Sequence, residues 1–250
     1  MVEIYEAESS CMAPLTPLRR LLKLFHPEGI PKPGTKLYNI VSKTGIFQRN
    51  YALLAQDILR YCKGGNCLDV GMGPGWLLIK LHEQSPSLHL HGIDISPSMV
   101  TKATANVHKA GFGGVIEVKG GDASHIPYRD GFFDAVVSTG SMHHWKEPVR
   151  ALNEIHRVLK HGGYALLYDV VSDTPQSVLK EAAREFGRMR MLLLWLHAFE
   201  EPFYGRQALA LLPEASLFKK GSTHFAGVLC CLAMRKETWN GYLREENIYG

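Results

Sequence analysis

Long apolar runs and a strong excess of charge of one sign are both missing from this sequence of 250 residues. No run approaches the roughly 18 apolar residues that a membrane-spanning helix requires, so we expect no transmembrane segment. The formal net charge of +4 is mild and gives no general case for a nucleic-acid partner. The opening stretch, MVEIYEAESSCM, is too acidic and polar for a signal peptide.

Cysteine is sparse and irregularly spaced. The five cysteines form no CxxC pair and no zinc-ligand spacing. Cys67 and Cys230 lie inside apolar, strand-like runs, which suits reduced thiols better than a disulfide framework. We therefore predict a soluble cytoplasmic protein that has no metal site.

Short β-rich runs alternate with longer helical patterns between about residues 66 and 171, which indicates a parallel sheet with crossover helices. Helices are expected over 97–110 and over 147–160, the second ending at Gly162 and Gly163. Two later runs flank a turn near Gly227 and predict a closing antiparallel hairpin. The expected strands are 67–71, 88–94, 115–120, 134–140 and 163–171, and the hairpin runs are 217–227 and 228–236.

The chain divides into three expected parts: a helical N-terminal cap (1–60), a ligand-binding domain (61–236) with a lid helix in 175–205, and a C-terminal tail (237–250). Within the cap, residues 15–25 place leucines on one helical face and basic residues on the other. Such a helix could rest peripherally on an anionic membrane. Packing against the main domain is the simpler alternative.

A cluster of glycines follows the first expected strand, in the stretch LDVGMGPGW. Glycine lets a ligand approach the backbone at the carboxyl end of a parallel strand. A dinucleotide site prefers the spacing G-x-G-x-x-G, but Trp76 stands where its third glycine would fall. A phosphate-binding P-loop would need Gly-Lys-Ser/Thr, which is absent here.

Acidic residues end the next two expected strands. Asp94 closes the second strand, where a carboxylate can accept hydrogen bonds from both hydroxyls of a ribose. Asp122 follows the third strand, in a position to accept from an exocyclic adenine amine. Together with the glycines, these acids indicate an adenosine site without phosphate chemistry.

The stretches LDVGMGPG, GIDIS, GDASHIPYRDGFFDAVVSTGSMHHW and EIHRVLKHGGYALLYD resemble successive signatures of the class I S-adenosylmethionine (SAM)-dependent methyltransferases. The resemblance covers roughly residues 65–171 and is closest to the small-molecule group that includes ubiquinone/menaquinone C-methyltransferases. It implies an α/β, Rossmann-like three-layer sandwich. The implied seven-stranded, mostly parallel sheet has the order 3-2-1-4-5-7-6, with strand 7 antiparallel.

The resemblance also implies a cofactor site for SAM and its product S-adenosylhomocysteine. The methionyl part would lie along the glycine loop and strand 4, the ribose on the acid of strand 2, and the adenine between two apolar side chains. The residues concerned are Asp69, Gly71, Met72, Gly73, Gly75, Asp94, Ile95, Met99, Asp122, Ala123, Ser138 and Thr139.

The acceptor site is less defined. His143 and His144 follow strand 4, where a histidine could take a proton from the acceptor; of the two, we favour His144 as the base. Trp145 could form an apolar wall, and the lid region is apolar and aromatic. The remaining pocket candidates are Tyr38, Trp195, Phe199 and Tyr204.

We therefore expect a SAM-dependent methyltransferase that acts on a small, apolar or aromatic metabolite, at carbon or oxygen, as a monomer or homodimer. One alternative is a SAM-fold protein that binds a ligand or partner without turnover. A nicotinamide-dependent oxidoreductase is a further alternative, which the glycine spacing disfavours.

Overall fold

The computed structural model describes residues 45–186 and 203–238. Within these residues, seven strands form one sheet in the order β3-β2-β1-β4-β5-β7-β6, with β7 antiparallel to both of its neighbours. This order and the antiparallel β7 confirm the expected fold. The strands are β1 (Gly65–Val70), β2 (Leu88–Asp94), β3 (Ile116–Gly120), β4 (Phe133–Thr139), β5 (Leu159–Asp169), β6 (Ser222–Ala226) and β7 (Leu229–Arg235).

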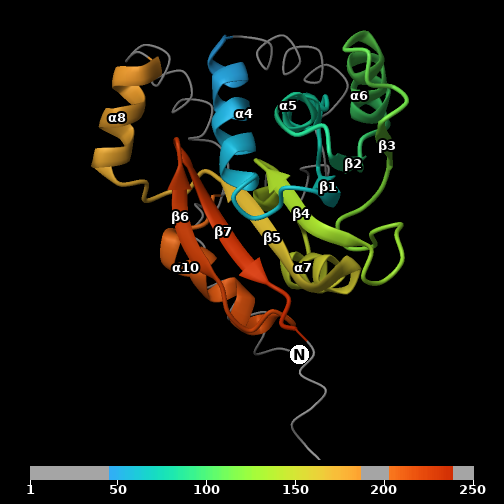
Figure 1. The fold of residues 1–250 in the computed structure, drawn as a ribbon. Helices are drawn as coiled ribbons and strands as arrows, with labels where there is room; N and C mark the ends of the chain where they lie inside the picture. Colours follow the sequence, from blue (N-terminus) through green and yellow to red (C-terminus); the bar gives the residue numbers. More distant parts are fainter. Residues whose placement is uncertain (1–44, 187–202, 239–250) are drawn as a thin grey trace, which may run out of the picture.

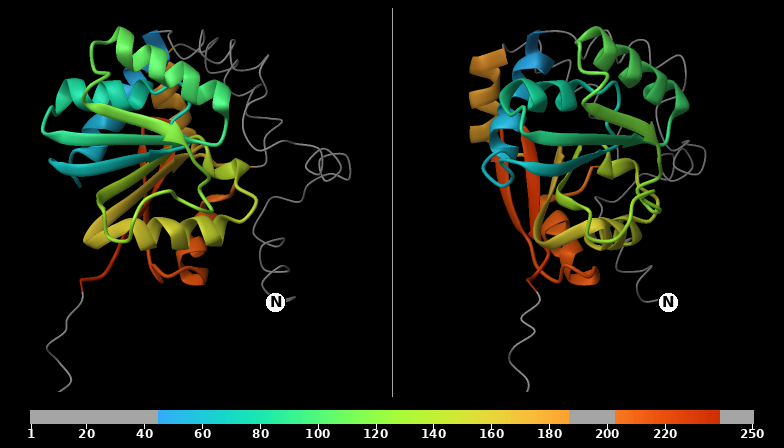
Figure 2. Two further views of the ribbon diagram at one scale, coloured as in Figure 1. Left: turned by 90° about the vertical axis from the view of Figure 1, so that its right-hand side faces the viewer. Right: turned by 45° about the vertical axis from the view of Figure 1, so that its right-hand side comes forward.

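Helices cover both faces of the sheet and complete a three-layer sandwich (Figure 1; Figure 2 shows the layers from two further sides). On one face, α4, α5 and α6 enclose a core that includes Leu54, Leu78 and Val107. On the other, α7, α10 and η2 enclose a core that includes Leu152, Leu209 and Leu212. The helices are α4 (Gly45–Ile58), α5 (Trp76–Gln84), α6 (Pro97–Lys109), α7 (Pro148–Val158), α8 (Gln176–Phe186), α10 (Arg206–Leu211), and the 3₁₀ turns η1 (Met142–His144) and η2 (Leu212–Ala215).

Most expected elements occur close to their expected positions. β2 has the expected bounds, and α6 starts at Pro97 after Ser96 and ends one residue early. The hairpin of β6 and β7 also forms, although β6 begins only at Ser222. The sequence patterns did not predict α10 and η2. Among the described residues, no helix has the length and apolarity to cross a membrane.

The end of α7 corrects one prediction. The helix stops at Val158, and β5 begins at Leu159, four residues before the expected strand. The pairing of β4 with β5 shifts register between Phe133 and Ala135, so residues 160–163 form an irregular start to the strand. Gly163 lies so close to β4 that an added Cβ would sit 2.9 Å from the Asp134 carbonyl oxygen. Gly163 therefore serves this close strand approach, and the two glycines do not end a helix.

α4 lies inside the expected N-terminal cap, yet it packs directly on the sheet. Leu54, Ala55 and Ile58 are fully buried in the same core as α5. The proposed membrane-contact helix at 15–25 and the tail from 239 onward lie outside the described residues. The described part of the expected lid comprises α8 and residues 203–205.

Candidate functional site

The glycine loop joins β1 to α5 at the carboxyl edge of the parallel strands. Gly71, Gly73 and Gly75 all have positive φ angles, of 74°, 53° and 78°, which side-chain-bearing residues rarely adopt. The amides of Gly71 and Met72 both donate to the Ile93 carbonyl oxygen, at 2.8 and 3.0 Å. The loop is therefore bound to the end of β2 and offers bare backbone at the sheet edge.

Two of these glycines are also required by the protein itself. A Cβ on Gly71 would lie 2.2 Å from Ser141 Oγ, and a Cβ on Gly75 would lie 3.2 Å from the Ala103 Cβ on α6. Met72 is buried, and its sulfur would lie only 2.4 Å from a Cβ on Gly92. The Met72 side chain thus packs into the core, so this position offers only backbone at the sheet edge.

Asp94 links the glycine loop to the next helix. Its Oδ2 accepts a hydrogen bond from the Gly73 amide at 2.9 Å, and its Oδ1 accepts from the Ser96 amide at 2.8 Å. Burial raises the pKa of Asp94, while these two backbone hydrogen bonds oppose the increase. Each carboxylate oxygen has a further lone pair, so the group can hold the loop and still accept from ligand hydroxyls.

Asp69 and Ser138 carry buried polar atoms that lack partners. Both carboxylate oxygens of Asp69 and the hydroxyl of Ser138 are inaccessible and have no hydrogen-bond partner among the described residues. Burial, and next the nearby charge of Asp94, raise the pKa of Asp69 to about 8. Unpaired buried groups of this kind are costly. A ligand that carries an ammonium group and hydrogen-bonding oxygens would satisfy them, which fits the methionyl part of SAM.

The expected adenine contacts differ in exposure. Ile95 is an exposed apolar side chain, 42% accessible, whereas Met99 is buried at 2%. Asp122 is exposed, and its Oδ1 accepts from the Ser124 amide at 2.8 Å in a tight turn. Ala123 is half-buried against the α7-side core. An exposed Ile95 directly after Asp94 is consistent with an apolar wall for a flat base.

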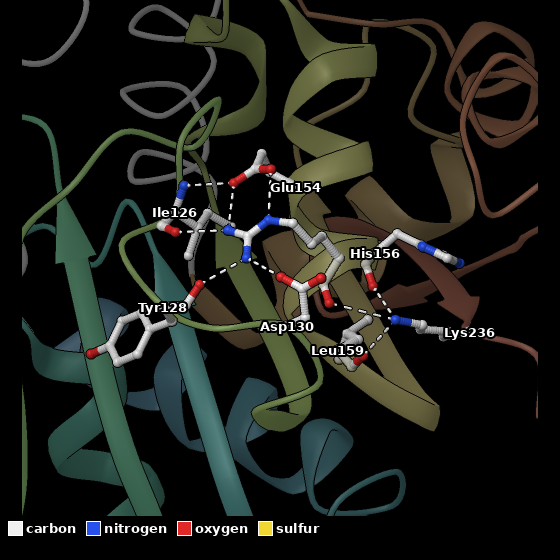
Figure 3. A network of polar contacts seen from close by, with 8 residues as sticks. Ile126, Tyr128, Asp130, Glu154, His156, Leu159 and Lys236 are labelled. Atoms are coloured by element: carbon white, nitrogen blue, oxygen red, sulfur yellow. Dashed lines mark hydrogen bonds and ion pairs between the residues drawn. The ribbon is translucent and has the colours of Figure 1, made fainter.

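An arginine on α7 holds the loop that carries Asp122 (Figure 3). Arg157 donates to the carbonyl oxygens of Ile126 and Tyr128, at 2.9 and 2.8 Å. It also pairs with Asp130 and Glu154, both at 2.7 Å, and these hydrogen bonds raise the pKa of Arg157. Sequence reasoning did not find this anchor, although Arg157 lies within the EIHRVLK stretch that the resemblance used.

The two histidines after β4 have different surroundings. His143 is buried, and its Nδ1 lies 2.9 Å from Asp169 Oδ2, while its backbone amide donates to the same oxygen at 3.1 Å. Asp169 ends β5 and is 2% exposed. His144 is half-buried, and its ring centroid lies 3.9 Å from that of His143. His143 is thus in contact with a buried carboxylate.

Sequence reasoning missed Asp169, although the available signal was the one used for Asp69 and Asp94: an acid at the end of a β-rich run. Its partner could not be found in the same way. His143 and Asp169 are 26 positions apart and meet only because β4 and β5 are neighbours in the sheet.

The expected acceptor pocket is only partly described. Trp145 is half-buried, and its indole N–H donates to Ser141 Oγ at 3.2 Å. Tyr204 is 4% exposed and belongs to the α7-side core, a position typical of a core residue rather than a pocket wall. Thr139 is half-buried at the end of β4. Tyr38, Trp195 and Phe199 lie outside the described residues.

The sheet order, the glycine loop after β1 and the acids at the carboxyl ends of β1 and β2 together define a class I SAM-dependent methyltransferase. Comparisons with known proteins agree. Residues 68–167 match a family described as a methyltransferase domain. The matched segment is therefore a methyltransferase domain, and SAM is its cofactor.

Two curated relatives have quinone-related names. The ubiquinone/menaquinone biosynthesis C-methyltransferase UbiE of Geotalea uraniireducens is 30% identical over 145 residues, which cover 58% of this chain and 61% of that protein. The 2-methyl-6-phytyl-1,4-hydroquinone methyltransferase 1 of Oryza sativa is 34% identical over 114 residues, which cover 46% of this chain and 33% of that protein. The chain thus spans less than two thirds of either relative.

A solved structure shares the fold. The crystal structure of a putative SAM-dependent methyltransferase from Methanococcus maripaludis superposes with a TM-score of 0.63 at 24% identity. The match covers 89% of this chain and 100% of that one. It supports the sheet topology described above.

Proposed function

We propose that this enzyme transfers the methyl group of SAM to a carbon or oxygen atom of a small aromatic acceptor, with a hydroquinone-like ring as the favoured class. The names of the two curated relatives, one a quinone-biosynthesis C-methyltransferase and one a hydroquinone methyltransferase, support this acceptor class. The setting of the reaction would be the cytoplasm. Both the acceptor and the setting are proposals for this chain.

The contact between His143 and Asp169 carries the proposal. A carboxylate oxygen accepts hydrogen bonds, so the Nδ1 atom facing it bears the proton. The Nε2 atom of the neutral ring then keeps its lone pair and can act as a base. Because Asp169 also accepts from the His143 backbone amide, it orients both the ring and the main chain of η1.

A base of this kind suits an acceptor that must lose a proton. A phenolic hydroxyl is a weak nucleophile, and its deprotonation makes both the oxygen and the adjacent ring carbons more reactive. In C-methylation a C–C bond forms as the S–C bond of the donor breaks, and the proton then lost from that carbon returns to the ring oxygen, so that one proton in all passes to the base. We assign that proton to His143 Nε2, with His144 as the alternative. An amine acceptor, whose nitrogen already carries a lone pair, would need such a base less.

We propose that the cofactor is held at the carboxyl edge of the sheet by Asp69, Asp94, Ser138 and the backbone of the glycine loop. SAM supplies an activated methyl group on a sulfonium when bound. The protein would contribute mainly by placing the acceptor atom in line with that group, since positioning alone can supply much of the acceleration.

The test compares Asp169→Asn with a matched control, Asp173→Asn. Asp173 lies on the same segment but pairs with Arg206 on the surface. Each protein is assayed for S-adenosylhomocysteine binding by calorimetry and for methyl transfer to substituted hydroquinones, phenols and amines. We expect Asp169→Asn to lower kcat on hydroquinones by about 10²-fold or more, because a general base contributes on that scale, and to leave cofactor affinity within about threefold.

The dependence of kcat on pH distinguishes a loss of the Asp169 contact to His143 from a general loss of folded structure. The dependence of kcat on pH should differ between the wild type and Asp169→Asn and should be unchanged in Asp173→Asn. Equal kinetics and pH profiles for both variants would remove the pair from the mechanism. Tight binding of S-adenosylhomocysteine with no turnover of any acceptor would instead favour a protein that binds without catalysing.

A further inference from the structure

A row of polar side chains crosses three strands beneath α4, on the sheet face opposite the α7-side core. Tyr168 on β5 is directly paired with Cys231 on β7, and Cys231 is directly paired with His224 on β6. Asp57 on α4 reaches down to this row: the Tyr168 hydroxyl donates to Asp57 Oδ2 at 2.9 Å, and His224 Nε2 lies 2.7 Å from the same oxygen. None of these residues belongs to the cofactor site or to the proposed base.

Three of these side chains bring together an oxygen, a nitrogen and a sulfur atom. The ligand atoms of Asp57, His224 and Cys231 all lie within 4.8 Å of one another. Asp57 and Cys231 are buried, at 7% and 0% exposure, while the His224 side chain is 30% exposed. Among the described residues, these three side chains form the group whose ligand atoms lie close enough together to hold a metal ion.

We propose that Asp57, His224 and Cys231 bind a divalent metal ion of borderline softness, of which Zn²⁺ is the representative. Carboxylate oxygen, imidazole nitrogen and thiolate sulfur are the donors that this class of ion takes from proteins. Three protein ligands leave one position of a tetrahedron for water, on the side where His224 meets solvent. Metal uptake would release the Cys231 thiol proton, and the single ring proton of neutral His224 would lie on Nδ1, so that Nε2 can bind the metal.

The distances require only small movements. Ligand atoms 2.0–2.3 Å from a tetrahedral Zn²⁺ lie about 3.3–3.8 Å apart. The contact between His224 Nε2 and Asp57 Oδ2 must therefore open by about 0.6 Å, and the widest pair, which includes Cys231 Sγ, must close by at most about 1.3 Å. His224 can supply this movement, because it is partly exposed on β6, the edge strand of the sheet.

The neighbours of the cluster have the roles expected around a metal. The Tyr168 hydroxyl orients the Asp57 carboxylate by a hydrogen bond, as groups adjacent to metal ligands commonly do. Arg60 donates to the other oxygen, Oδ1, at 3.3 Å, so Oδ2 faces the cluster. Burial raises the pKa of the Cys231 thiol. In the absence of metal the thiol is therefore protonated, and a bound cation would reverse that preference.

Cobalt titration of the full chain tests the proposal, because Co²⁺ bound to a thiolate gives a charge-transfer absorption band. We expect the wild type to bind one equivalent of Co²⁺ with this band and Zn²⁺ to remove it by displacement. Zn²⁺ should also raise the melting temperature, since it binds the folded state in preference to the unfolded one. The band should be absent from Cys231→Ser.

Cys230→Ser is the matched control. Cys230 is the adjacent residue on β7 and is also buried, but its side chain belongs to the opposite, α7-side core. This variant should therefore keep the band. If Cys231→Ser fails to fold, His224→Gln on the edge strand replaces it, and we expect at least a tenfold loss of Co²⁺ affinity. No band in the wild type would overturn the proposal. So would a band that persists in Cys231→Ser, is lost in Cys230→Ser, or is unchanged in affinity in His224→Gln.

Discussion

Replacing Asp69 with asparagine should change how the stability of the protein depends on pH. The Asp69 carboxyl is fully buried without a hydrogen-bond partner among the described residues, and its pKa is raised from 3.8 to about 8. Between those two pH values the folded protein keeps a proton that the unfolded chain has lost. The free energy of unfolding therefore falls as the pH rises through this window.

The size of the effect follows from the proton count. One proton bound by the folded state alone changes the free energy of unfolding by about 1.4 kcal/mol per pH unit. Between pH 5 and pH 7 the Asp69 contribution falls by about 3 kcal/mol. Asparagine cannot ionise, so Asp69→Asn lacks this contribution, while the other titrating groups are common to both proteins.

The measurement is urea denaturation of both proteins at pH 5, 6 and 7 without cofactor. We expect the stability of Asp69→Asn relative to the wild type to increase by about 3 kcal/mol from pH 5 to pH 7. A difference that stays constant over this range would refute the assignment of a protonated, unpaired carboxyl to Asp69.

Cofactor binding provides a second, independent test of Asp69. If the amino group of S-adenosylhomocysteine pairs with Asp69, saturating ligand should lower the pKa of the carboxyl and flatten the pH dependence of the wild type. Calorimetry at pH 7 in buffers of different ionisation enthalpy should then show release of up to one proton on binding. If the pH dependence of stability is unchanged with ligand bound, Asp69 does not belong to the cofactor site. The result of the denaturation experiment without ligand would still stand.

Two further predictions concern the scaffold around the site, and both are checked by urea denaturation. Gly71→Ala should destabilise the protein by about 2–3 kcal/mol, because its φ is positive and the added Cβ would collide with Ser141 Oγ. Gly131→Ala, with a φ of 60° and open space around the added atom, should cost only about 1 kcal/mol; equal losses would contradict the close approach. Arg157→Met should cost about 2–3 kcal/mol, since it removes hydrogen bonds to two carbonyls and two carboxylates. The control Arg150→Met, on the same helix with one exposed partner, should cost about 0.5 kcal/mol or less, and matching values would show that the loop does not depend on Arg157.

Local patterns were sufficient for much of the fold. The bounds of β2 and the start of α6 follow from alternation, a capping serine and a first-turn proline, each of which acts within a few residues. The irregular start of β5 could not be predicted in this way. Gly162 and Gly163 are typical of a helix end, and only the pairing of β5 with β4 shows that Gly163 allows two strands to approach each other.

The residues of the candidate site likewise fall into those that local sequence patterns predict and those that only the folded structure reveals. Acids at strand ends marked Asp69 and Asp94, because the carboxyl ends of parallel strands meet at one edge whatever the order of the strands. That Asp69 has no hydrogen-bond partner among residues 45–186 and 203–238, and that Arg157 anchors the Asp122 loop, could be learned only from the packed structure. So did the contact of His143 with Asp169, since two adjacent histidines in a sequence do not reveal that one of them faces a buried carboxylate.

The sequence by itself determined the class of this enzyme and its methyl donor, because glycine spacing and strand-end acids are local features that keep their meaning in any member of the fold. Tertiary structure alone brought Asp169 to His143, and it alone placed His224 against Asp57, which are 167 positions apart. Such meetings depend on which strands are adjacent and in what register, and these are set by packing across the whole sheet rather than by any short stretch of residues.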